Sequence, residues 1–102
     1  MSDDRHRISL DDALVMVRRA REAALLPVHG WRIGGGIIRE ILAQDGAEGL
    51  RVYLGLGDDG VPTLVFMAAD DQGADMPHGV LAELTWPCPP FCDDTSPFNR
   101  SE

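Results

Sequence analysis

Two segments of apolar residues, joined by a short glycine-rich turn, constrain the fold of this chain most strongly. In LRVYLGL, residues 50–56, every second side chain is a leucine or a valine. GDDGVP follows at residues 57–62, and TLVFMAA at residues 63–69 is apolar on both faces. Alternation predicts a β-strand, because successive side chains of a strand point to opposite faces. The sequence therefore predicts an antiparallel β-hairpin, which is only marginally stable unless other elements cover it.

Two helices are predicted before this hairpin, and we expect both to cover it. Ser9 is suited to cap a helix, because Asp12 stands three residues later and apolar residues then recur at helical spacing. This pattern predicts a helix over residues 9–26. The apolar residues of IIREIL predict a second, shorter helix over residues 36–45, with Gly46 directly after its end.

The remaining segments carry weaker signals. HGWRIGGG, residues 29–36, is interpreted as a connector, because three consecutive glycines are too flexible for a regular element. Residues 80–86 alternate as in a strand, although one or two helical turns are the alternative. We expect an α+β fold with two N-terminal helices packed on the hairpin, a third strand at 80–86, and an irregular Pro/Cys C-terminal tail. Residues 1–92 are expected to form one domain, followed by a disordered acidic tail over residues 93–102.

The net charge of this chain comes from its second half. Residues 1–51 hold eight acids and eight arginines, whereas residues 52–102 hold nine acids and one arginine, which gives −8. An acidic surface repels phosphate, so we expect no nucleic-acid partner. Apolar runs are far shorter than the roughly 20 residues of a membrane span, and the charged N-terminus has no apolar signal region. We therefore expect a cytoplasmic protein without a membrane partner.

The sequence does not favour an enzyme. His6, His29 and His78 lie in three separate places, and no serine stands in a G-x-S-x-G context. GLGDDG, residues 55–60, matches the dinucleotide pattern G-x-G-x-x-G. That pattern requires a helix after it, whereas a strand is predicted here, and two aspartates would repel phosphate. We interpret this segment as a hairpin turn.

Both cysteines lie in TWPCPPFC, near the C-terminus. If the prolines open a helical turn, the Cα atoms of Cys88 and Cys92 lie about 6 Å apart, within reach of a disulfide. If the prolines hold polyproline II, the separation is about 12 Å, and neither a bond nor a shared metal forms. Zinc normally takes four ligands, and the two cysteines supply two of them. His78 is a candidate for the third ligand, and Asp75 or His29 is a candidate for the fourth. Packing thiols, a disulfide, a metal site and a redox switch all stay open.

Four segments together resemble a family of small bacterial proteins: IREIL at residues 38–42, EGLRVYLGL, TLVFMAADDQGADM and WPCPPFC. Those proteins share a helix that ends in a leucine pair, two strands, an Asp-Gly-x-Asp loop and a terminal PCPPxC motif. The resemblance covers residues 37–92. It implies no activity, but it suggests that the cysteine pair and the loop at residues 70–75 are functional.

We therefore expect a small acidic protein that acts by protein–protein association, with a protein partner or with itself as a homodimer, and not as an enzyme. No cofactor is needed for this function. The alternative is a metal-binding or thiol-switch protein that uses Cys88 and Cys92. In that case His78 is the expected third ligand, and the metal is zinc or another thiophilic ion.

Overall fold

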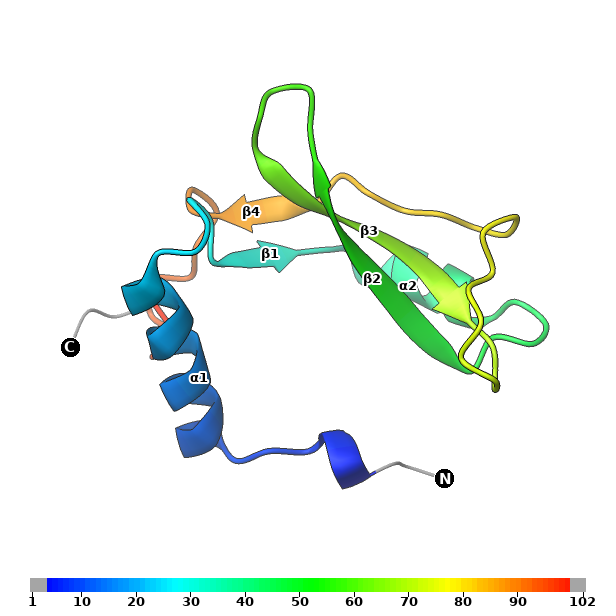
Figure 1. Cartoon of the computed structure of the whole chain (residues 1–102), viewed down its shortest axis with the longest axis horizontal. Helices are drawn as coiled ribbons and strands as arrows, with labels where there is room; N and C mark the ends of the chain where they lie inside the picture. Colours follow the sequence, from blue (N-terminus) through cyan, green and yellow to red (C-terminus); the bar gives the residue numbers. More distant parts are fainter. Residues whose placement is uncertain (1–3, 100–102) are drawn as a thin grey trace.

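The computed structural model describes residues 4–99, which form helices and antiparallel strands in a mixed α+β fold (Figure 1). In chain order the elements are a 3-10 helix Asp4–His6, α1 Leu10–Ala23, β1 Gly30–Arg32, α2 Gly35–Leu42, β2 Gly49–Leu56, β3 Pro62–Ala69 and β4 Trp86–Cys88. β2 pairs with β3, and β1 pairs with β4, in two separate antiparallel sheets. The predicted α+β class is confirmed.

β2 and β3 form the predicted hairpin, in which Leu56 lies opposite Pro62. The turn between them is closed by a hydrogen bond of 3.0 Å from the Gly57 N–H to the Val61 carbonyl oxygen. Gly60 has a φ of +80°, which glycine adopts at little cost because it carries no Cβ. The G-x-G-x-x-G match therefore lies in a hairpin turn, as predicted.

Both helices end earlier than predicted. The Ser9 hydroxyl accepts a hydrogen bond of 3.0 Å from the Asp12 N–H, so the predicted N-cap of α1 is confirmed. Ala24 adopts a left-handed conformation with a φ of 51°, which ends α1 before the predicted residue. α2 ends at Leu42, and Gly46 lies in the following turn with a φ of +86° rather than directly after the helix.

The small sheet of β1 and β4 corrects two predictions. The third strand predicted at residues 80–86 does not form, and Ala82 makes only an isolated bridge with Phe66. A strand begins instead at Trp86 and pairs with β1, which lies in the segment 29–36 that was predicted to be a connector. Strands of three residues are too short to show a recognisable alternation, which explains why β1 and β4 were not predicted. Residues 80–86 do alternate, but they make only the one bridge to β3, so alternation alone did not indicate a strand there.

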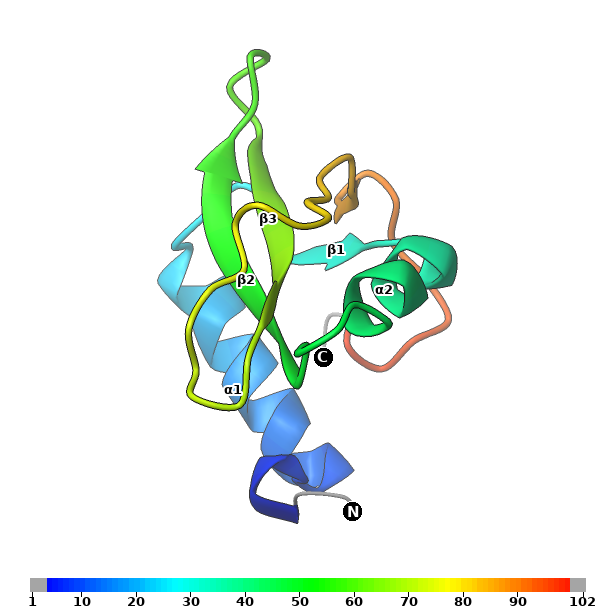
Figure 2. The ribbon, with the colours of Figure 1, turned by 90° about the vertical axis from the view of Figure 1, so that its right-hand side faces the viewer.

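The hydrophobic core is small and lies on one side of the hairpin. Ile41 of α2 is completely buried and packs with Phe66 and Ala68 of β3. No residue of α1 is buried, and α1 lies away from α2 in both views (Figures 1 and 2). The sequence predicted that both helices cover the hairpin. Within the described residues, only α2 contributes to the core.

The segment after β4 follows a series of turns. Within residues 93–99, the Ser96 N–H donates to the Asp93 carbonyl oxygen over 3.1 Å. The disordered tail predicted for residues 93–102 also includes residues 100–102, which lie outside the described residues. The division into one domain and a disordered tail stays a prediction.

Candidate thiol and metal site

The pairing of β1 with β4 brings His29 beside Cys88. The His29 N–H donates a hydrogen bond of 2.8 Å to the Cys88 carbonyl oxygen, just before β1 begins. Gly30 lies directly opposite Cys88 in the register of the two strands. A Cβ added at Gly30 would lie 3.7 Å from the Cys88 Cβ, which is ordinary contact distance. Two residues far apart in the sequence thus share one end of a short sheet.

Cys88 and Cys92 form a disulfide, and their Cα atoms lie 4.7 Å apart. The Phe91 N–H donates to the Pro87 carbonyl oxygen over 2.9 Å and so closes the turn between the two cysteines. The segment is a non-helical turn that brings the cysteines within disulfide reach, so it differs both from the helical turn and from the extended polyproline II segment considered from the sequence. The disulfide was one of the four states that the sequence left open, and it does not by itself establish a role for the pair.

His29 completes a cluster with the two cysteines. One imidazole nitrogen of His29 and the Sγ atoms of Cys88 and Cys92 all lie within 4.8 Å of one another. Partial burial lowers the pKa of His29 from its ordinary value, and the nearby positive charge of Arg21 lowers it further. A neutral imidazole can bind a metal, whereas an imidazolium cannot. The cluster lies against an open pocket of about 310 Å³, so solvent and ions can reach it.

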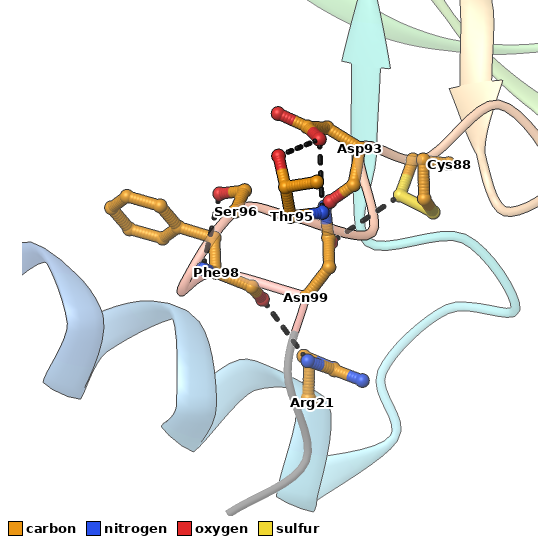
Figure 3. Close-up of a disulfide and its surroundings, with 8 residues drawn as sticks. Arg21, Cys88, Asp93, Thr95, Ser96, Phe98 and Asn99 are labelled. Atoms are coloured by element: carbon orange, nitrogen blue, oxygen red, sulfur yellow. Dashed lines mark hydrogen bonds between the residues drawn. A yellow bond between two sulfur atoms is a disulfide. The ribbon is translucent and has the colours of Figure 1, made fainter.

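A segment that we call the C-terminal strap, residues 93–99, runs from the disulfide to α1 (Figure 3). The Asp93 carboxylate accepts hydrogen bonds from the Thr95 N–H and hydroxyl, which lower the pKa of Asp93. The Asn99 amide donates to the Asp93 carbonyl oxygen over 2.8 Å. The Phe98 carbonyl oxygen accepts a hydrogen bond of 3.0 Å from the Arg21 guanidinium of α1. These bonds fix the strap beside the sulfur atoms.

Asn99 is the strap residue that approaches the disulfide. Its side-chain oxygen lies 3.6 Å from the Sγ of Cys88. A disulfide sulfur has no hydrogen to donate, so in the oxidised protein this approach is a contact only. A thiol at Cys88 would be able to donate a weak hydrogen bond to the same oxygen.

The ligands expected from the sequence are only partly brought together. Cys88 and Cys92 belong to the cluster, and so does His29, which was an alternative fourth ligand. His78 is exposed in the loop between β3 and β4 and does not belong to the cluster, the one group of three or more potential ligands within the described residues. Asp75, the other alternative, accepts hydrogen bonds from Arg51 and from the Tyr53 hydroxyl on the outer side of the hairpin.

Comparison with known proteins adds no functional assignment. No helix within residues 4–99 has the length and apolar character needed to cross a membrane. No protein-family model, curated protein or solved structure matches this chain.

Proposed function

We propose that this protein acts by protein–protein association, and that its partner is a second copy of the chain. The observation that carries this proposal is the β2 face, which consists of four apolar side chains on one side of β2. Each of these side chains is between 36% and 73% exposed. They are Leu50, Val52, Leu54 and Leu56.

The β2 face belongs to the same side of the hairpin as the core. Val52 lies opposite Phe66, and Leu54 lies opposite Leu64, so these cross-strand pairs share one face. α2 is only eight residues long, and its buried residue Ile41 packs against β3. The half of this face that β2 contributes is left open to solvent. A second copy would complete the core by covering it.

The chain exposes more surface than a compact monomer of its mass, as a protein that covers part of its surface with a partner would. The chain exposes 7575 Å², whereas a compact monomer of 11.1 kDa exposes about 5,700 Å². Its radius of gyration is 15.3 Å, compared with about 13 Å for a compact domain of this length. The excess area is about 1,900 Å², and stable dimers bury about 800 Å² or more of each partner. An interface of this size therefore fits within the excess.

Two further features concern how the copies would meet. β2 pairs only with β3 among the described strands, so its other edge offers backbone groups to a partner strand. Each copy carries a charge of −8, so two copies repel each other at low ionic strength. The attraction must then come from apolar burial, and added salt should strengthen the association.

The test is sedimentation velocity across micromolar concentrations, together with the variant Leu54→Ala. We expect twice the chain mass of 11.1 kDa for the wild type. Burial of a whole leucine contributes about 1.5–3 kcal/mol, so covering the 63% of Leu54 that is exposed contributes about 1–2 kcal/mol. A symmetric dimer contains this contact twice, so the dissociation constant should rise roughly 30-fold to several hundred-fold.

Leu84→Ala is the matched control, because Leu84 is 83% exposed but lies in the loop before β4. This variant should dimerise as the wild type does. A monomer at every concentration would refute the proposal. Equal effects of the two leucine variants would show that general surface hydrophobicity, and not the β2 face, holds the copies together.

A further inference from the structure

We propose that reduction of the Cys88–Cys92 disulfide creates a zinc site with three protein ligands. The ligands are one imidazole nitrogen of His29 and the two cysteine sulfurs, and a water molecule takes the fourth position. This site differs from the one that the sequence suggested, because His29 replaces His78. It is independent of the proposed self-association, which involves the β2 face.

The distances within the cluster are close to those that zinc needs. Zinc–sulfur bonds of about 2.3 Å and zinc–nitrogen bonds of about 2.0 Å place the ligand atoms of a tetrahedral site roughly 3.4–3.8 Å apart. The three candidate atoms already lie within 4.8 Å of one another. The two sulfur atoms, about 2.05 Å apart in a disulfide, must separate by about 1.7 Å once that bond is broken, and the imidazole nitrogen must approach by at most about 1.3 Å. Rotation about the side-chain bonds supplies movements of this size.

The backbone keeps these side chains together when the disulfide is open. The hydrogen bond from the His29 N–H to the Cys88 carbonyl oxygen involves no sulfur atom. The bond from Phe91 to Pro87, which closes the cysteine turn, also uses main-chain atoms only. The arrangement of His29, Cys88 and Cys92 therefore does not depend on the disulfide alone.

The metal site forms in two steps, reduction of the disulfide and then binding of zinc. A thiol reductant supplies two electrons and two protons to the disulfide, which becomes two thiols, while two reductant thiols become a disulfide. Zinc then binds both sulfurs as thiolates and displaces the two thiol protons to solvent, while His29 binds as neutral imidazole. Thiolate and imidazole ligands together suit zinc among the common divalent ions.

The surroundings favour a solvent-accessible site with one open position. The pocket beside the cluster is open, and Asp93 is among the residues that line it. Within the described residues, no fourth side chain of metal-ligand type joins the cluster. Zinc sites with three protein ligands commonly keep water in the fourth position. The disulfide is then the oxidised, metal-free state, and the thiols are the metal-binding state in a reducing compartment.

Cobalt(II) serves as the spectroscopic probe. Protein reduced with a phosphine, without oxygen, should bind one cobalt ion per chain and show thiolate-to-cobalt charge-transfer absorption. Added zinc should displace the cobalt, because zinc binds such ligands more tightly. At pH 7, about two protons should be released per metal, since free thiols have a pKa of about 8.5. The oxidised protein should show none of this absorption.

Two histidine variants identify the third ligand. His29→Ala removes the imidazole but keeps the backbone bond to Cys88, and it should weaken cobalt binding at least about tenfold, since the loss of even an outer-shell partner costs that much. His78→Ala should bind cobalt as the wild type does. Equal binding by His29→Ala and the wild type would overturn the assignment, and weaker binding by His78→Ala would restore the sequence-based one. Equal binding by the oxidised and reduced proteins would overturn the whole proposal.

Circular dichroism of each variant without metal checks that the fold is kept. If His29→Ala proves unfolded, His29→Gln retains a side chain of similar reach, and the same loss of binding is expected. Sedimentation of the reduced protein reports the self-association separately, so failure of one proposal is distinguishable from failure of the other.

Discussion

Ala24 ends α1 in a left-handed conformation, with φ at 51° and ψ at 46°, and a glycine at this position should stabilise the helix. The left-handed region costs an L-residue about 1–2 kcal/mol, a cost that glycine avoids. Glycine loses more backbone entropy on folding than alanine does, which reduces this stabilisation by about 0.5–1 kcal/mol. The net expectation for Ala24→Gly is a stabilisation of about 0.5–1 kcal/mol, because the hydrogen bond of 3.0 Å from its N–H to the Arg21 carbonyl oxygen is kept.

Ala23→Gly is the matched control, because Ala23 is the last residue of α1 and has a helical backbone. Glycine in a helix is less favourable than alanine by about 0.8–1.0 kcal/mol, or somewhat less at a helix end. The same substitution at two neighbouring positions should therefore have opposite signs. The two variants should differ by roughly 1–2 kcal/mol.

The measurement must report the unfolding of α1 separately from the unfolding of the whole protein. No side chain of α1 is buried within the chain, so α1 can unfold separately from the hairpin. Hydrogen exchange of the α1 amides should slow in Ala24→Gly and quicken in Ala23→Gly, while urea unfolding reports the whole protein. If Ala24→Gly speeds exchange as Ala23→Gly does, the left-handed helix end is refuted. If the melting temperature of the whole protein also shifts, α1 unfolds together with the rest, as a covered helix in a dimer would.

Further predictions concern the core and the outer side of the hairpin. Ile41→Ala should destabilise the protein by about 2–5 kcal/mol in urea unfolding, because Ile41 is completely buried. Leu42→Ala is the control and should lower the stability far less, because Leu42 is 44% exposed. Similar losses of stability for both variants would contradict the position of the core. Tyr53 donates to the Asp75 carboxylate, which raises the pKa of Tyr53 above its ordinary value of 10.0. A raised pKa means that the stabilisation is present below the unfolded pKa and is lost as the pH rises through the folded one. Ultraviolet titration of Tyr53, the only tyrosine, should show a lower pKa in Asp75→Asn, and an unchanged value would exclude this hydrogen bond.

Local signals account for the elements that the sequence predicted. The hairpin follows from the alternation in β2 and the turn glycines, and the start of α1 follows from Ser9 and Asp12. The openness of the β2 face has no such signal. Alternation indicates which side of a strand is apolar, but not whether another element covers it. That depends on the length of α2 and on where α1 lies, and both are set by contacts between distant parts of the chain.

The positions of His29 and His78 show why distance along the sequence does not indicate which histidine lies beside the cysteines. His78 lies only ten residues before Cys88, but an extended segment of that length can span about 33 Å. In Figure 1 the chain leaves β3 at one end of the hairpin and returns along it to β4, with Ala82 bridged to Phe66 on the way. His78 lies in this intervening segment and does not belong to the cluster of His29, Cys88 and Cys92. The antiparallel pairing of β1 with β4 places Gly30 opposite Cys88, so the histidine beside the sulfurs is the preceding residue, His29.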